Sequence, residues 1–572
     1  MKLTGHPYLL RRVFLAAVLV LGATSLFMRA LQLQVLNQDF LRGQGEARYA
    51  RVVPVAAHRG MILDRHGEPL AASTPVDSVW VNPQEFAATP AQFSDLSRLL
   101  ETSSDVINNT IYTHAVDEFT FIKRQISPEL AQAVMALKIP GLALQREYRR
   151  YYPAGEVTAH ALGFTDIDDK GQEGLELAYE DALHGVPGKR KIIRDPFGHL
   201  VEEVISLREP EPGRDVILSI DRRLQYLAYR ELKAAVQRHG ARAGSAVVLD
   251  VKTGEVLAMV NQPAFNPNNR DELHGDHTRN RVATDVFEPG STLKPFTVAA
   301  ALESGKFRPA TMIDTAPGFF KVGNATVHDV HNYGRIDVTT VLQKSSNVGV
   351  SKMALEMSAE QLWHAFTRAG FGGKASADFP GEVGGVLKNY KQWHDVERVT
   401  AAYGYGVSVT ALQLVRAYAA LADDGHLLPV AFTRVDNRAP LAKSGEQVFR
   451  PELTAQLRRM LETVSQEGGT GTEARVAGYR VAGKTGTVKK NHDGGYSEHS
   501  YLAVFAGFAP VSNPRLAMVV MIDEPQGDVY YGGQVAAPVF GKVMSDALRL
   551  LNIAPDGVVL SPAHLALLER GQ

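Results

Sequence analysis

The chain contains 572 residues, and its 61 lysines and arginines nearly balance its 62 aspartates and glutamates, which gives a formal net charge of −1. Hydrophobic residues make up 45% and charged residues 22%, as in ordinary globular proteins, and the balanced charge argues against a nucleic-acid partner. Cysteine is absent, which excludes disulfides and cysteine-ligated metals. A chain of this length is expected to form about three or four domains.

The first predicted element is an apolar segment near the N-terminus. Val13 to Met28 is a run without a charged residue, and neighbouring apolar residues extend it on both sides. We therefore expect a cytoplasmic tail at residues 1–12 and a retained transmembrane anchor at residues 13–35. A cleaved signal peptide is the alternative, but the nearest small-residue pattern, Ala23-Thr24-Ser25, lies inside the run. Arginines on both sides of the run mean that the positive-inside rule only leans toward a cytoplasmic N-terminus.

Residues from about 45 to 215 show a mixed α/β pattern with many turn signals. Three strings stand out there: Arg59 to Gly67, Arg150 to Phe164 and Gly171 to Glu176. Asp64-Arg65-His66-Gly67 predicts a tight turn with an ion pair, and no nucleophile–base pair is evident. We expect this segment to support the rest of the chain and to carry no chemistry itself.

The segment 216–555 is predicted to form one sheet covered by helices, followed by a C-terminal tail at 556–572. Strand hairpins at 246–260 and at 501–509 with 515–523 bracket a helical middle from about 291 to 425. Pro538 to Leu551 has the pattern of a closing amphipathic helix. Strands at both ends with helices between them indicate an α/β (α+β) fold.

Three short strings in this segment carry chemical groups: Ser291-Thr292-Leu293-Lys294, Ser345-Ser346-Asn347 and Lys484-Thr485-Gly486-Thr487. A serine hydroxyl needs a base beside it to act as a nucleophile at neutral pH. Residues at i and i+3 share one face of a helix, so Ser291 and Lys294 can point into one cleft. A lysine that is desolvated there, near a second cation such as Lys484, loses part of its affinity for protons and can act as that base.

Other interpretations of these strings are weaker. Gly478 to Thr485 matches a phosphate-binding loop, but such a loop must open a helix, and the residues after Lys484 favour a strand. The second Lys-Thr-Gly, at residues 252–254, is typical of a hairpin turn. His328 and His331 lack a third candidate ligand, so we predict no metal site there.

The three strings, their order, the N-terminal anchor and the Arg59–Gly67 string resemble the class B (monofunctional) penicillin-binding proteins. The strings at 402–406 and 530–533 resemble the division-specific septal branch of that family. The resemblance implies a transpeptidase domain of the penicillin-binding/serine β-lactamase type with an antiparallel sheet, an elongated N-terminal α/β pedestal of the dimerisation type, and one transmembrane helix. It implies a periplasmic D,D-transpeptidase of the bacterial inner membrane that cross-links peptidoglycan stem peptides at the septum, needs no cofactor and is acylated by β-lactams. It also implies a membrane glycosyltransferase and divisome proteins as partners.

The resemblance also assigns roles to single residues. Ser291 attacks the penultimate D-Ala carbonyl, Lys294 takes the serine proton, and Ser345 returns a proton to the leaving amine. Asn347 holds Lys294 and donates to a substrate carbonyl, while Lys484 supplies positive potential. Substrate binding is expected at Thr485, Gly486, Thr487, Tyr405, Tyr530 and Tyr531. A β-lactamase or a β-lactam sensor is the alternative, but no acid is placed by motif to activate a deacylating water, and Glu288 reads as a turn residue.

Overall fold

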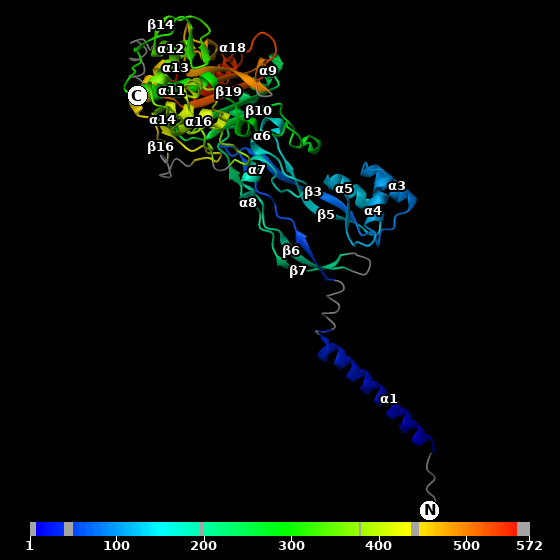
Figure 1. The fold of residues 1–572 in the computed structure, drawn as a ribbon. Coiled ribbons are helices and arrows are strands. Elements are labelled where there is room, and N and C mark those ends of the chain that lie inside the picture. The colour runs from blue at the N-terminus through cyan, green and yellow to red at the C-terminus, as the bar shows by residue number, and fades with distance from the viewer. Residues whose placement is uncertain are drawn as a thin grey trace, which may run out of the picture. The chain divides into compact units, whose positions relative to one another are not determined.

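The computed structural model describes residues 7–38, 40, 50–194, 200–376, 379–435, 445–492 and 495–557. It forms two compact units (Figure 1). The first unit comprises Met1–His58, Thr74–Arg149 and Gly185–Gly213, and the second comprises Arg59–Ser73, Arg150–His184 and Arg214–Gln572. The segments interleave along the chain, and the predicted domain boundaries stay predictions. Most of the predicted tails, residues 1–6 and 558–572, lies outside the described residues.

The N-terminal apolar segment is a helix whose side chains are exposed. Helix α1 (Pro7–Leu31) continues into a π-helical turn, η1 (Gln32–Leu36). Together they give a stretch from Tyr8 to Leu36 that is long and apolar enough to cross a membrane. Leu10 is 78% exposed and Leu21 is 76% exposed, which lipid but not water would stabilise.

Besides α1, the described part of the first unit contains one small sheet, strands of a second sheet and the helices α3, α4 and α5. The first sheet has the order β1 (Ala50–Val55), β6 (Gly188–Arg194), β7 (Leu200–Arg208). In the second sheet, β3 (Pro69–Val81) pairs with both β4 (Thr120–Ile126) and β5 (Leu142–Tyr151). Helices α3 (Pro90–Leu99), α4 (Ser104–Thr113) and α5 (Pro128–Ala136) begin at the caps Thr89, Ser103 and Ser127. Val79, Leu96 and Val134 are buried between this sheet and these helices.

The second unit is built on a five-stranded antiparallel sheet. Its strands, in sheet order, are β10 (Val256–Gln262), β9 (Ala243–Asp250), β19 (Leu516–Asp523), β18 (Gly495–Ala509) and β17 (Ala482–His492). All eight residues of β9 are buried, because helices cover both faces of the sheet. The predicted fold class is confirmed, including the antiparallel sheet covered by helices.

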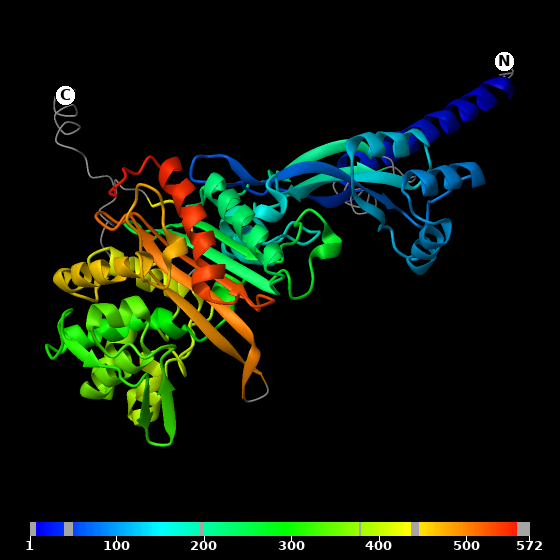
Figure 2. The same ribbon diagram turned by 90° about the horizontal axis from the view of Figure 1, so that it is seen from above.

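The two helical layers differ in size. Helices α9 (Arg222–Arg238) and α19 (Ala537–Leu550) share one apolar cluster with Val248 and Val520 of the sheet. Figure 2 shows α19, in red, crossing that face, with the yellow and green helices grouped on the other side. The larger layer contains α10 (Arg281–Thr284), α11 (Lys294–Glu303), α12 (Val338–Lys344), α13 (Asn347–Glu356), α14 (Ala359–Arg368), α15 (Asp395–Ala402), α16 (Ala411–Ala422) and α17 (Pro451–Ser465).

The helical middle predicted from about 291 to 425 is present, but one region of it is not helical. Four short strands interrupt it: β11 (Met312–Asp314), β12 (Phe319–Val322), β13 (Ala325–His328) and β14 (Arg335–Asp337). They pair as β11 with β14 and β12 with β13, so each is stabilised by a partner that no local periodicity reveals. Strand β18 also begins six residues before the predicted 501, because it pairs with β17.

The three strings of the N-terminal half meet inside the second unit. Arg59 and Arg150 both donate to Glu176, at 2.9 and 2.6 Å, and all three side chains are buried. The predicted turn is present, because the Gly67 N–H donates to the Asp64 carbonyl at 3.0 Å. The turn's ion pair joins Arg65 to Glu255 at 3.2 Å. Removing one member of the buried cluster of Arg59, Arg150 and Glu176 would leave an uncompensated charge, which typically costs about 3–5 kcal/mol of folding stability.

The second unit also contains several shorter strands and helices. They are β2 (Ile62–Leu63), β8 (Val216–Ile217), β15 (His426–Leu427), β16 (Glu446–Gln447), α6 (Ala159–Leu162), α7 (Gly174–Ala178), α8 (Glu180–Leu183) and α18 (Gly532–Val535).

Candidate active site

Ser291 lies in a tight turn that leads into the buried helix α11. The turn is the 3-10 helix Gly290–Leu293, and α11 follows it directly at Lys294. Gly290 has a φ of +52°, and the neighbouring Gly404 packs so closely that a Cβ there would lie 2.1 Å from the Gly290 carbonyl oxygen. Only glycine fits both positions, so the backbone around the half-buried Ser291 is fixed from two sides.

Lys294 is fully buried, and its amine is held by acceptors from the junction between helices α12 and α13. The Nζ atom donates to the Ser345 carbonyl at 2.5 Å and to Asn347 Oδ1 at 2.7 Å, and it lies 3.2 Å from Ser345 Oγ. Burial lowers the pKa of Lys294 to about 7, against the opposing effect of the Asp329 carboxylate. A neutral amine has two N–H donors and one lone pair. The two strong contacts use the donors, which leaves the lone pair free to accept a hydroxyl proton.

The Ser-Ser-Asn string forms the sharp junction between α12 and α13. Ser345 ends α12 with φ +62° and ψ 38°, a left-handed conformation that is uncommon for serine. Ser346 then caps α13 by accepting from the Gly349 N–H at 2.9 Å. This turn points the Ser345 carbonyl and the Asn347 side chain at Lys294, which a continuous helix could not do.

Asp329 fixes this junction, and sequence reasoning missed it. Its carboxylate accepts from the Asn347 N–H at 2.5 Å, the Val348 N–H at 3.0 Å and the Ser346 hydroxyl at 2.6 Å. The adjacent His328 carbonyl accepts from Asn347 Nδ2 at 2.9 Å. One of the two N–H groups of the Asn347 side-chain amide is therefore already used, and the other remains for the predicted contact with substrate. The sequence gives no signal for Asp329, because it lies in a loop some 17 residues before Ser346.

The third string runs along the edge strand β17, beside the Ser291 turn. A Cβ on Gly486 would lie 3.1 Å from Thr292 Cγ2 and 3.2 Å from the Pro289 carbonyl oxygen, so the strand packs closely on the turn. Lys484 is fully buried, and burial together with the charge of Lys294 lowers its pKa well below the usual range. The structure therefore brings the two lysines of the first and third strings close enough to repel.

The two threonines of the third string have protein partners. Thr485 Oγ1 lies 2.7 Å from Thr470 Oγ1, and Lys484 Nζ donates to the Thr485 carbonyl at 3.3 Å. Thr487 Oγ1 accepts from the Gly532 N–H at 2.9 Å, which leaves its own proton available for an anionic ligand. Thr470 is a second residue that sequence reasoning missed, since a glycine-flanked threonine in a loop carries no distinctive signal.

The predicted tyrosines fall into two clusters, each of which includes a tyrosine of strand β18. Tyr405 contacts Tyr496 edge-on at 5.5 Å between ring centroids, and Tyr403 at 5.7 Å. Tyr530 stacks on Tyr501 at 4.1 Å and on Tyr531 at 4.6 Å. Tyr496 and Tyr501 were not predicted, although both lie in strand β18.

The arrangement suits acyl transfer. It combines Ser291 on a rigid turn, the buried Lys294 with its lowered pKa, and the lysine and threonines of the string from Lys484 to Thr487. Comparisons with known proteins agree with this class of enzyme. Residues 244–545 match the penicillin-binding protein transpeptidase domain, and residues 54–218 match the penicillin-binding protein dimerisation domain. The chain therefore belongs to the penicillin-binding protein transpeptidases and has the class B architecture, which confirms the resemblance seen in the motifs.

Individual relatives cover almost the whole chain. It is 42% identical over 545 residues to the probable peptidoglycan D,D-transpeptidase PenA of Neisseria meningitidis, covering 95% of this chain and 92% of that protein. It is 41% identical over 567 residues to the peptidoglycan D,D-transpeptidase FtsI of Escherichia coli, covering 98% and 95%. The apo transpeptidase domain of Burkholderia pseudomallei penicillin-binding protein 3 is 44% identical, with a TM-score of 0.55, and covers 59% of this chain and 97% of that domain.

Proposed function

We propose that the chain is a peptidoglycan D,D-transpeptidase that cross-links stem peptides during septal cell-wall synthesis and is acylated by β-lactams. The observation that supports this most directly is the buried Lys294 amine, held at 2.7 Å from Asn347 Oδ1 and with a pKa lowered to about 7. A lysine in that state can take a proton from Ser291 at neutral pH.

The proposed first half-reaction forms an acyl-enzyme. Lys294 takes the Ser291 proton while Oγ attacks the carbonyl of the penultimate D-Ala, and the C–N bond to the terminal D-Ala breaks. Lys294 then returns this proton through the Ser345 hydroxyl, 3.2 Å from its amine, to the leaving amine, so both side chains end the step as they began it. The Thr487 hydroxyl would bind the terminal carboxylate through its free proton, and Lys484 would add positive charge there once the bound anion favours its protonated form. Backbone N–H groups of Ser291 and Thr487 would form the oxyanion hole.

The second half-reaction passes the acyl group to an amine of a neighbouring stem peptide. The ester must therefore survive until the amine arrives. The string before Ser291 contains one acid, Glu288, whose carboxylate accepts from the Tyr496 hydroxyl and the Gly406 N–H. Both contacts are made to neutral donors of the protein, and no acid is placed by motif to activate the deacylating water that a β-lactamase needs.

The proposed location is the bacterial inner membrane, with the N-terminal helix as the single anchor and the catalytic domain in the periplasm. The exposed apolar stretch from Tyr8 to Leu36 supports the anchor. A membrane glycosyltransferase and divisome proteins are the proposed partners. Two reporters fused after residue 572, one active only in the periplasm and one active only in the cytoplasm, test the orientation. Activity of the periplasmic reporter supports the proposed orientation, and activity of the cytoplasmic reporter alone contradicts it.

The experiment that tests the activity uses a stem pentapeptide donor and an amine acceptor. The purified chain should release D-Ala and form a cross-linked product seen by mass spectrometry. Ser291→Ala should abolish both products while leaving the melting temperature nearly unchanged, because it removes one hydroxyl from a half-buried position. Product formation by Ser291→Ala at the wild-type rate would contradict the proposal.

A further inference from the structure

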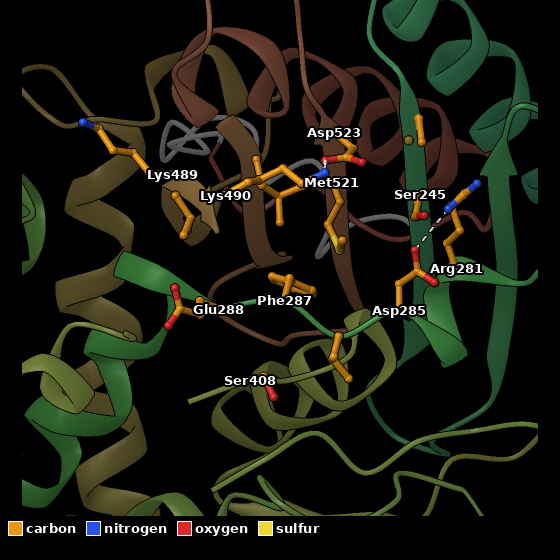
Figure 3. Close-up of a pocket in the computed structure, with 15 residues that line it drawn as sticks. Ser245, Arg281, Asp285, Phe287, Glu288, Ser408, Lys489, Lys490, Met521 and Asp523 are labelled. Atoms are coloured by element: carbon orange, nitrogen blue, oxygen red, sulfur yellow. Dashed lines mark hydrogen bonds and ion pairs between the residues drawn. The ribbon is translucent and has the colours of Figure 1, made fainter. Parts of the chain in front are cut away.

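A cavity of about 420 Å³ lies against the segment that leads into Ser291 (Figure 3). Its lining includes residues of strands β9, β17, β18 and β19 and the stretch from Asp285 to Glu288. Three carboxylates line it. Asp285 pairs with Arg281 at 3.2 Å, and Asp523 pairs with Lys490 at 2.7 Å. Figure 3 shows both pairs joined, whereas Glu288 stands apart from the cations drawn.

Glu288 is the third carboxylate, and its partners are neutral. Its Oε1 atom accepts from the Gly406 N–H at 2.7 Å, and its two oxygens lie 3.2 and 3.1 Å from the Tyr496 hydroxyl. Burial and the nearby Glu288 charge raise the pKa of Tyr496, so this hydroxyl stays a proton donor. Within the described part of the chain, no lysine, arginine or histidine forms an ion pair with Glu288. A half-buried carboxylate in this setting is suited to a cation that comes from outside the protein.

The reaction proposed above supplies such a cation. Its second substrate is a primary amine, which is an ammonium ion at neutral pH. Glu288 precedes the nucleophile by three residues, and the rigid turn at Gly290 fixes the path between them. We propose that Glu288 binds the ammonium group of the acceptor stem peptide and positions it for attack on the acyl-enzyme, with the cavity receiving the acceptor chain. This inference rests on the proposed transpeptidase function and adds a site for its second substrate.

The proton balance of the step is complete with groups of this chain and solvent. The ammonium held by Glu288 first loses one proton to solvent water. The freed nitrogen lone pair forms the new C–N bond with the acyl carbon, and the bond from that carbon to Ser291 Oγ breaks. The second nitrogen proton passes to Oγ through Lys294, which begins and ends the step as a neutral amine.

The test separates the second half-reaction from the first. A thioester donor acylates the protein, and two acceptors compete with water: a diamino acid whose amine is an ammonium ion, and hydroxylamine, which is uncharged. For Glu288→Gln we expect the apparent KM of the ammonium acceptor to rise about tenfold or more, with transfer to hydroxylamine within about twofold of wild type. Glu288→Asp, which keeps the charge, should recover part of the loss. Asp285→Asn is the matched control, because that carboxylate lines the same cavity but already has arginine partners.

Each outcome decides the matter. A selective loss with the ammonium acceptor supports the site, and an equal loss with both acceptors, or no loss, overturns it. If Glu288→Gln does not fold, the wild-type protein gives the answer: added salt should raise the KM for the ammonium acceptor and not for hydroxylamine, and equal responses overturn the site. Failure of the wild-type protein to form any acyl-enzyme would instead count against the proposed function itself.

Discussion

At the scale of single residues, the chemistry depends on a lysine that is buried and still reactive. The spacing of Ser291 and Lys294 and the presence of a second lysine were enough to predict a lowered pKa. The sequence could not reveal how the amine is held. The Ser345 carbonyl, at 2.5 Å, is a backbone group, and a backbone acceptor has no signature in a sequence.

The lowered pKa of Lys294 predicts the pH dependence of acylation. Because the protonated amine cannot take the serine proton, the second-order rate constant for penicillin acylation should fall about tenfold per pH unit below the pKa, which is about 7. Above that value the rate constant should level off until other groups titrate. Stopped-flow acylation of the wild-type protein over this range measures the midpoint. A flat profile down to two units below pH 7 would exclude Lys294 as the base.

At the scale of elements, the junction between α12 and α13 depends on the carboxylate of Asp329. Asp329→Asn keeps one acceptor oxygen but loses the charge, so the free energy of unfolding should fall by about 1–3 kcal/mol. Since the Asp329 charge raises the pKa of Lys294, the midpoint of the acylation profile should also shift to lower pH. Denaturant unfolding and the pH profile measure the two effects.

Asp337→Asn is the matched control for this junction. Asp337 caps α12 by accepting from the Thr340 N–H at 2.7 Å, and it is not among the groups that shift the pKa of Lys294. This variant should lose comparable stability and keep the midpoint. If both variants shift the midpoint equally, the change reflects general loosening of the helices and not the charge of Asp329.

The close approach of Gly404 to Gly290 gives a second prediction at this scale. Gly404→Ala adds a Cβ that would lie 2.1 Å from the Gly290 carbonyl oxygen, at a φ of +86°. We expect a loss of about 2–5 kcal/mol in the free energy of unfolding and slower acylation, since the Ser291 turn must move. Gly305→Ala, with φ +73° and open space around the Cβ, isolates the backbone strain and should cost about 1–2 kcal/mol. Equal losses in both variants would show that the contact with Gly290 is unimportant.

At the scale of the whole molecule, the predictable features were those with strong local patterns. The hairpin around Lys252-Thr253-Gly254, the strand after Lys484 and the closing helix α19 follow from residue periodicity and turn residues. The short strands between Met312 and Asp337 do not, because their pairing and not their composition stabilises them. The same limit applies to Asp329, Thr470 and Tyr496, which reach the site through tertiary contacts.

The anchor and the catalytic unit should be separable. The second compact unit begins at Arg59, so deleting residues 1–44 removes the exposed apolar helix and none of the described site. We expect the truncated protein to remain in the supernatant without detergent and to acylate with penicillin at the full-length rate. Size-exclusion chromatography and acylation kinetics, with the detergent-solubilised full chain as reference, check this. Aggregation of the truncated protein would indicate that the helix also stabilises the folded part.

The proposed reaction requires Ser291 to form a lasting ester at the site that contains Lys294 and Lys484. Incubation of the full-length protein with penicillin, followed by intact-mass and peptide mass spectrometry, tests it most directly. We expect one penicilloyl adduct per chain, located on Ser291, that persists for many minutes to hours with almost no release of hydrolysed drug. An adduct on another serine, or steady hydrolysis faster than about one turnover per second, within the ordinary range for enzymes, would contradict it.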